Sequence, residues 1–249
     1  MAKAADQANN ISIGDSLALA DGSVAALAGC GGKTALAERL ALLLRHKKVL
    51  LSPTTKIFPM QAEGVMLCQT AEECQAHRPQ IGIQCMGELN RASGKLEALP
   101  AEILAALIPQ YDIALLEADG SRGLPCKGWR EGEPVIPGYC THTIGIVTMS
   151  ALGRAATAEQ VHNLPEFLAL TGLCEGEPIT AQALEHMVCA PNGMFCGSAG
   201  RRVLLVNQVE DAETSRLAQG FLQTIKEKYP DRFSKMLCGS ILSDAWGEV

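Results

Sequence analysis

The stretch SVAALAGCGGKTALAERLALLL, Ser23–Leu44, decides the fold. Its apolar start, Val24–Leu27, predicts a short buried strand, and the leucines after the glycines recur at helical spacing, which predicts a helix over 33–45. A strand, a glycine-rich turn and a helix in this order are typical of a phosphate-binding loop. The full motif G-x-x-x-x-G-K-[ST] would need a glycine at position 27, where the sequence has Leu27.

The glycine-rich turn supplies the groups that a triphosphate needs. Backbone N–H groups at the start of a helix attract phosphate oxygens through their hydrogens and through the helix dipole. Lys33 adds a positive charge for the β- and γ-phosphates, and Thr34 offers a hydroxyl to Mg²⁺. Cys30 is either a reactive thiol or a small apolar filler. The expected nucleotide-binding residues of the loop are Gly29, Cys30, Gly31, Gly32, Lys33 and Thr34.

Acidic residues follow the clearest buried strand, Ile113–Leu116, in the segment YDIALLEADGSRG. Mg²⁺ prefers hard oxygen ligands, so Glu117 and Asp119 join Thr34 as the expected metal residues. Glu117 directly follows the apolar run and is expected to hold the metal, whereas Asp119 is expected in a flexible turn, as a general base or a positioner. Arg122 on the same turn could clamp a γ-phosphate or an anionic substrate. The expected catalytic residues are Asp119, Arg122 and Lys33.

Polar side chains also follow two other expected strands. The segment SPTTKI ends the strand Val49–Ser52, and its Thr54, Thr55 and Lys56 are expected at the same edge of the sheet. Asn207 ends the strand in RRVLLVNQVED and is expected to contact a nucleotide base. The guanine-reading motif N-K-x-D would need lysine and aspartate where the sequence has Gln208 and Glu210. ATP and GTP therefore both remain candidate nucleotides.

Strands and helices alternate along the chain, which predicts an α/β protein with a mostly parallel sheet and helices on both faces. Further helices are expected after Pro100, over Glu159–Leu170, over Thr180–Val188 and over 211–229, and KMLCGSIL is expected to be the last strand. Residues 1–22 are expected to form a tail and lead-in, the first ten of them frayed, and residues 23–249 one domain. Ligands of such sheets bind beyond the carboxyl ends of the strands.

Composition narrows the class of protein. The 249 residues are 47% hydrophobic, enough for a sizeable core, and the net charge of −6 gives no basic excess for binding nucleic acid. No apolar run approaches the roughly 18 residues that a membrane span needs, and the first ten residues do not resemble a secretory signal. The ten scattered cysteines form no C-x-x-C pair, so we expect reduced thiols in the cytoplasm.

Seven blocks occur in order along the chain and together resemble one family. They are AGCGGKTAL, SPTTKIF, LLEADGSRGLPCKG, EPVIP, ALGR, VHNLPEFLALTG and RRVLLVNQ. In these blocks the chain resembles the YqeC family, accessory proteins of selenium-dependent molybdenum hydroxylases that are also called selenium cofactor biosynthesis proteins. The resemblance covers 24–242, and EADGSRG and EPVIP are its most specific parts. Departures are Cys30, where a small alanine is common, and Ser52-Pro53, which replace a fuller run of threonines.

The resemblance implies a P-loop NTPase fold, Mg²⁺ and cytoplasmic work in cofactor maturation. It gives the phosphate role to the glycine loop with Lys33 and Thr34, and the metal role to Glu117 or Asp119. The family is similar to a P-loop class of metal-insertion GTPases and dimerising ATPases, in which an acid ends the strand and a glycine lies three residues on, as Glu117 and Gly120 do here. The implied partners are a nucleoside triphosphate, a selenium- or molybdenum-cofactor precursor and a hydroxylase apoenzyme, and a homodimer is one arrangement of this class.

Three functional interpretations remain open from the sequence. The first is an enzyme that hydrolyses a nucleoside triphosphate or transfers its phosphoryl group to an anion or a cofactor precursor, with Arg122 and Lys127 binding the acceptor. The second is a nucleotide-gated accessory protein that hydrolyses slowly, dimerises and delivers a cofactor. The third is a module that binds nucleotide without turnover. Product formation that depends on an acceptor would separate the first from the other two.

Overall fold

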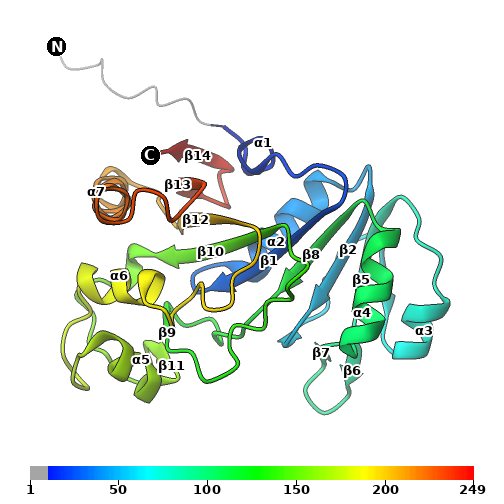
Figure 1. Ribbon diagram of the computed structural model, residues 1–249, viewed down its shortest axis with the longest axis horizontal. Helices are drawn as coiled ribbons and strands as arrows, with labels where there is room; N and C mark the ends of the chain where they lie inside the picture. The colour runs from blue at the N-terminus through cyan, green and yellow to red at the C-terminus, as the bar shows by residue number, and fades with distance from the viewer. Residues whose placement is uncertain (1–10) are drawn as a thin grey trace.

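The computed structural model describes residues 11–249, so the expected frayed tail lies outside the described residues. The fold is built on a nine-stranded sheet in the order β14-β13-β12-β10-β1-β8-β2-β5-β4 (Figure 1). All neighbours pair in parallel except β14, which is antiparallel to β13. The sheet strands are β1 (Ser23–Gly29), β2 (Lys48–Pro53), β4 (Val65–Cys68), β5 (Gly82–Met86), β8 (Ile113–Glu117), β10 (His142–Thr148), β12 (Arg201–Asn207), β13 (Lys235–Ser240) and β14 (Ala245–Glu248).

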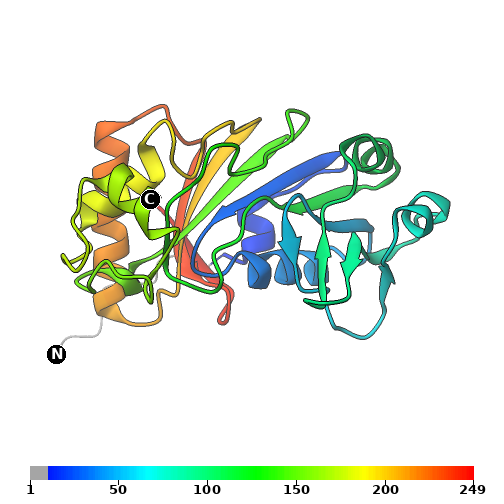
Figure 2. The same ribbon diagram turned by 90° about the horizontal axis from the view of Figure 1, so that it is seen from below.

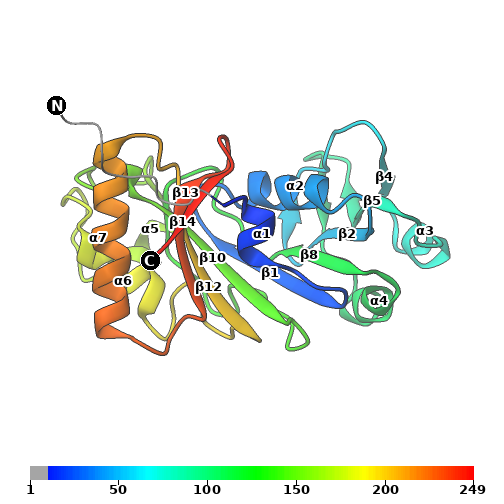
Figure 3. The same ribbon diagram turned by 90° about the horizontal axis from the view of Figure 1, so that it is seen from above.

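Helices cover both faces of this sheet, as the sequence predicts (Figure 3). Side chains alternate between the faces along each strand. Ala25 and Leu27 of β1 pack in a core under α1 and α2, whereas Val24 and Ala26 belong to the core of the opposite face. That opposite face is covered by α3 and α4 beside β2, β5 and β8, and by α5, α6 and α7 beside β10, β12 and β13. The helices are α1 (Ile13–Leu17), α2 (Lys33–Leu43), α3 (Ala71–Ala76), α4 (Ala101–Leu107), α5 (Leu164–Thr171), α6 (Ala181–Cys189) and α7 (Ala212–Lys228).

Two small sheets lie outside the main one, and the sequence did not predict them. One is antiparallel, with strands β3 (Lys56–Ile57), β7 (Lys95–Glu97) and β6 (Glu88–Asn90) side by side (Figure 2). The other pairs β9 (Cys126–Lys127) with β11 (Val161–His162). These strands have only two or three residues each, too few for a hydrophobic pattern to show.

Two expectations, one boundary and one last strand, are wrong. The helix expected over Glu159–Leu170 begins only at Leu164, because residues 161–162 form β11 and Pro165 lies in the first helical turn, where its ring is tolerated. The expected last strand, β13, is followed by β14, whose Trp246 is almost fully buried in the core under α1 and α2. Of the expected lead-in, α1 packs on α2 and β14, with Ile13 fully buried.

Candidate functional site

The glycine-rich loop joins the central strand β1 to α2 at the carboxyl edge of the sheet. Gly29, Gly31 and Gly32 all have positive φ, at 103°, 89° and 131°, a conformation that favours glycine. A Cβ on Gly32 would lie 2.6 Å from Nδ2 of Asn207, which donates a 2.7 Å hydrogen bond to the carbonyl of Gly31. The loop therefore admits no side chain at this position, and β12 fixes its course.

Lys33 opens α2 and lies folded over the loop. Its ammonium donates to the carbonyl of Gly29 and lies 3.2 Å from Oδ1 of Asp119. Lys33 is only 4% exposed. Burial alone would lower the pKa of the ammonium; nearby Asp119, Cys30 and Glu117 outweigh it and raise the pKa above 10.5. The positive charge of Lys33 is thus held at the start of the helix.

Asp119 lies in the turn after β8, as the sequence predicts, but its side chain is fully buried. Its carboxylate accepts hydrogen bonds from the indole Nε1 of Trp129 at 2.6 Å and from the backbone N–H of Gly29 at 3.2 Å. The ammonium groups of Lys33 and Lys127 lie 3.2 and 3.6 Å away. Both oxygens already have partners, so this carboxylate ties β8 to the loop and fixes Lys33.

Lys127 was expected to bind an acceptor together with Arg122, and its position contradicts that. The side chain is fully buried, donates to the carbonyl of Gly120 at 2.8 Å and forms an ion pair of 2.9 Å with Glu133. With Asp119 also beside it, the ammonium holds the turn that follows β8. Arg122 on that turn is exposed and has a left-handed φ of 52°.

Thr34 and Glu117 lie together, as expected of metal-binding residues. The hydroxyl of Thr34 donates a 2.9 Å hydrogen bond to Oε2 of Glu117, the last residue of β8. Burial raises the pKa of Glu117 above 4.5, although Lys33 and the Thr34 hydrogen bond oppose the rise. A buried carboxylate with a raised pKa gains from a cation beside it, and the two oxygens are the hard ligands that Mg²⁺ prefers.

A cavity of about 520 Å³ opens over the loop. Gly31, Gly32, Lys33, Thr34 and Glu117 line it. The rest of its lining is Ala35 of the same helix and residues of four other segments: Lys56, Ile57, Phe58, Lys95, Gly120, Ser121, Arg122, Gly123 and Gln208. Asp119, Cys30 and Asn207 lie behind this lining. The structure thus brings together the loop, Glu117 and Arg122, and keeps Asp119 beneath them.

Asn207 and Gln208 both brace neighbouring segments. The amide of Asn207 donates to Gly31 and accepts a 3.0 Å hydrogen bond from the N–H of Ile241 after β13. Gln208 accepts a 2.7 Å hydrogen bond from Thr148 at the end of β10. Asn207 therefore holds the loop against the ends of β12 and β13 and does not line the cavity.

Most of the cysteines are buried, and so is Thr54. Burial raises the pKa of Cys30 to about 12, which fits an apolar filler and not a reactive thiol. All ten cysteines are free thiols, and only Cys174 is exposed. Thr54 is buried and donates to the carbonyl of Val135 at 2.7 Å, whereas Thr55 and Lys56 reach cavities at this edge.

Sequence patterns did not single out three residues of the site. Trp129 fixes Asp119, and Lys95 and Phe58 line the cavity, with the ammonium 4.8 Å from the ring centroid. Lys95 lies in β7 of the small sheet β3-β7-β6, and Phe58 directly follows β3. No sequence pattern predicted this sheet. For Trp129 a signal existed, since an indole in the block that follows EADGSRG needs a hydrogen-bond partner when buried.

Residues 11–249, the part of the chain that the structure describes, contain neither a metal-binding cluster nor a membrane-spanning helix. No group of three or more His, Cys, Asp or Glu side chains gathers there as a metal-binding cluster. Nor does that part of the chain contain a helix long and apolar enough to cross a membrane.

Comparison with known proteins agrees with the resemblance in the sequence. The family model described as YqeC protein matches residues 25–165, which include the glycine loop, Glu117, Asp119 and Trp129. Uncharacterized protein YqeC of Escherichia coli strain K12 is 30% identical over 217 residues, covering 82% of this chain and 83% of that protein. The chain belongs to the YqeC family.

Proposed function

We propose that this protein binds a nucleoside triphosphate with Mg²⁺ in a P-loop and hydrolyses it or transfers its phosphoryl group. The observation that carries the proposal is the contact between Thr34 and Glu117 beside the glycine loop. A hydroxyl from the first helical turn and a carboxylate from the neighbouring strand end form a pair of hard oxygens next to the expected β- and γ-phosphates.

The residues present fit such a ligand. The N–H groups that open α2 attract phosphate oxygens, and Lys33 neutralises their charge once it turns from the carbonyl of Gly29. Thr34 would hold the metal, and Glu117 would hold it directly or through water. The metal would neutralise the charge that develops on the phosphates. Arg122, on the rim, would contact the γ-phosphate, and Asp119 would keep Lys33 in position.

The family resemblance supports a narrower role, in which turnover assists the maturation of a selenium-dependent molybdenum hydroxylase or of its cofactor in the cytoplasm. Membership of the YqeC family is the support for it. In the enzyme version a cofactor precursor accepts the phosphoryl group; in the gated version the nucleotide controls the binding of the apoenzyme. Mass spectrometry of mixtures with Mg-ATP and candidate precursors separates the two.

Nucleotide binding itself is tested on Lys33. The variant Lys33→Met keeps the apolar stem and removes the charge, while Asp119 retains Lys127, Trp129 and the N–H of Gly29 as partners. Calorimetry with a non-hydrolysable ATP analogue should show an affinity about 10- to 100-fold below that of the parent, the loss expected for a charge-assisted hydrogen bond. Lys47→Met, which removes a lysine paired with Asp21 outside the cavity, is the control. Equal affinity in the parent and in Lys33→Met would remove the loop from the proposal.

A further inference from the structure

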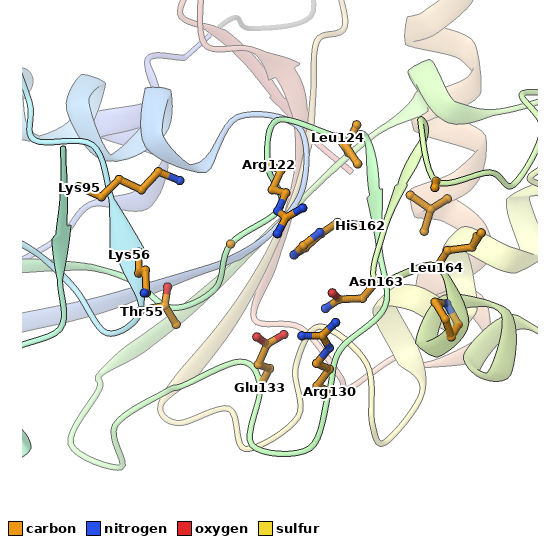
Figure 4. Close-up of a pocket in the computed structure, with 14 residues that line it drawn as sticks. Thr55, Lys56, Lys95, Arg122, Leu124, Arg130, Glu133, His162, Asn163 and Leu164 are labelled. Atoms are coloured by element: carbon orange, nitrogen blue, oxygen red, sulfur yellow. The ribbon is translucent and has the colours of Figure 1, made fainter. Parts of the chain in front are cut away.

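A second cavity, of about 760 Å³, adjoins the first (Figure 4). The two share four residues: Lys56, Lys95, Gly120 and Arg122. The residues that line only the second cavity are Thr55, Leu124, Arg130, Glu133, Ala158, Val161, His162, Asn163, Leu164 and Pro165. Figure 4 shows Arg122 and His162 reaching into the space from above and Glu133 and Arg130 from below. This volume suits a metabolite of about nucleotide size.

The charge of the second cavity is positive. Lys56, Lys95, Arg122 and Arg130 line it against one carboxylate, Glu133. That carboxylate is already paired with the buried ammonium of Lys127 at 2.9 Å. Of the lining cations, Lys56 pairs with Glu97 at 2.7 Å, and Arg130 contacts Glu166 at 3.2 Å through Nε. The terminal nitrogens of both arginines remain available for a bidentate anion.

The start of α5 also lines the second cavity. Asn163, before the first turn of α5, has a left-handed φ of 55°, and its amide donates 3.1 Å to the carbonyl of Gly128 and does not cap the helix. The N-terminal turn of α5 therefore has no side-chain cap where Leu164 and Pro165 line the cavity. Arg122, also left-handed, lines the same space. Strained conformations of this kind collect at sites that bind ligands.

His162 supplies an uncharged polar group on the same wall. Burial lowers the pKa of its imidazole below 6.5; Lys127, Arg122 and Arg130 lower it further, against the opposing effect of Glu133. At neutral pH the ring is therefore one donor and one acceptor, suited to a hydroxyl or amide of a ligand. The cavity joins several fixed cations to one neutral hydrogen-bonding ring.

We propose that the second cavity binds the second substrate, a small organic anion that carries a phosphate ester or a carboxylate. Arg122 and Arg130 hold the anionic group, and His162 contacts a polar group of the same molecule. Because Arg122 and Gly120 line both cavities, this substrate lies next to the phosphate end of the nucleotide. The assignment as second substrate rests on the proposed function; the anion site itself stands on the lining residues. Lys127, which holds the turn, has no direct part in it.

Residues that line only one cavity allow a test of each site separately. The protein is first loaded with Mg²⁺ and a non-hydrolysable ATP analogue, and calorimetry then follows titration with ribose 5-phosphate or with tricarballylate. Arg130→Ala should bind the preferred anion about 10- to 100-fold more weakly than the parent, with nucleotide affinity within twofold. Arg78→Ala, an exposed arginine outside both cavities, is the matched control. The better of the two anions identifies the class as phosphate ester or carboxylate.

An independent readout comes from the ring of His162. Its NMR signals, assigned with His162→Gln, should shift on addition of the anion, and its pKa should rise because a nearby negative charge favours the imidazolium. Binding of the nucleotide without binding of either anion would overturn the second site alone, as would equal anion affinity in Arg130→Ala and Arg78→Ala. Failure of the parent to bind the nucleotide, with anion binding still sensitive to Arg130, would overturn the proposed function and keep the anion site.

Discussion

The hydroxyl of Thr34 lies 2.9 Å from Oε2 of Glu117, across 83 positions of sequence. The first turn of α2 supplies one group and the end of β8 the other, and β8 is the direct neighbour of β1 in the sheet. The order of the strands therefore brings the hydroxyl and the carboxylate together. The pair lines the cavity over the glycine loop, and its behaviour toward Mg²⁺ is the first property to test.

Glu117→Gln should weaken the Mg²⁺-dependent part of nucleotide affinity. The amide keeps the shape and can still accept from Thr34, but it loses the charge that orients a metal or its water. Loss of a partner of this kind typically costs 10- to 100-fold in metal affinity. Titration of Mg²⁺ at fixed nucleotide concentration measures the change.

The matched control for this variant is Glu38→Gln. Glu38 is half-buried on the same helix, α2, and does not line the cavity. Its variant should bind Mg²⁺ and nucleotide like the parent. If Glu117→Gln also bound like the parent, the metal would have to lie elsewhere.

Nucleotide binding should release a proton in mildly acidic solution. The pKa of Glu117 is raised above 4.5 by burial, so the carboxyl is protonated at a higher pH than an ordinary glutamate. Mg²⁺ favours the charged form, so Mg²⁺-dependent affinity should fall as pH drops through the raised pKa. The stability of the ligand-free protein depends on pH in the opposite direction. The folded state binds this proton more tightly than the unfolded chain does, so the free energy of unfolding rises as pH falls from the raised pKa toward 4.5.

Calorimetry in two buffers of different ionisation enthalpy counts the released proton. Glu117→Gln should abolish the release that depends on Mg²⁺, because no proton is left to give up at this position. A release that persisted in the variant would belong to another group and would contradict the assignment.

Asp119→Asn should destabilise the protein. It leaves the buried ammonium groups of Lys33 and Lys127 without their shared counter-charge, and loss of one partner from a buried ion pair costs about 3–5 kcal/mol in the free energy of unfolding. Asp21→Asn breaks the surface pair with Lys47 and should cost under about 1 kcal/mol. Urea denaturation of both variants gives the comparison.

A milder variant guards against loss of folding at Asp119. Trp129→Phe keeps the charge of Asp119 but removes the 2.6 Å indole hydrogen bond and part of the ring, and should cost about 2 kcal/mol, less than the loss of the charge. One outcome would instead support the general-base role that the sequence predicts for Asp119. If Asp119→Asn were as stable as the parent and kept nucleotide binding, yet lost turnover by about 10²–10⁴-fold, Asp119 would act as a general base.

The sequence predicted the sheet and the loop because both depend on local patterns. Apolar runs gave the strands that carry the site, and a glycine-rich turn followed by Lys33 and Thr34 marked the helix start. The rule that parallel strands end at one edge of the sheet predicted Glu117 beside the loop.

The burial of individual side chains could not be predicted from local sequence patterns. Asp119 lies only two residues beyond Glu117, yet it is buried because Trp129, ten residues further on, folds back to donate to it. The second cavity depends on β3, β9 and β11, which have two residues each. Arg130 and His162 meet there through tertiary packing that no periodicity records.

The residues that follow β12 bear on the choice between adenine and guanine. Asn207 uses its amide on Gly31 and Ile241, Gln208 replaces the lysine of N-K-x-D, and Glu210 replaces the aspartate and accepts from Ser240 at 3.3 Å. With this set we expect ATP and GTP affinities to differ by less than a hundredfold, or about 2.7 kcal/mol. Competition of each nucleotide against one fluorescent analogue in excess Mg²⁺ measures the ratio, and Glu210→Gln is the informative variant.

If Glu210 read a guanine, GTP would bind more than a hundredfold tighter than ATP, and Glu210→Gln would weaken GTP alone. Equal effects of Glu210→Gln on both nucleotides are expected, because its carboxylate is engaged with Ser240.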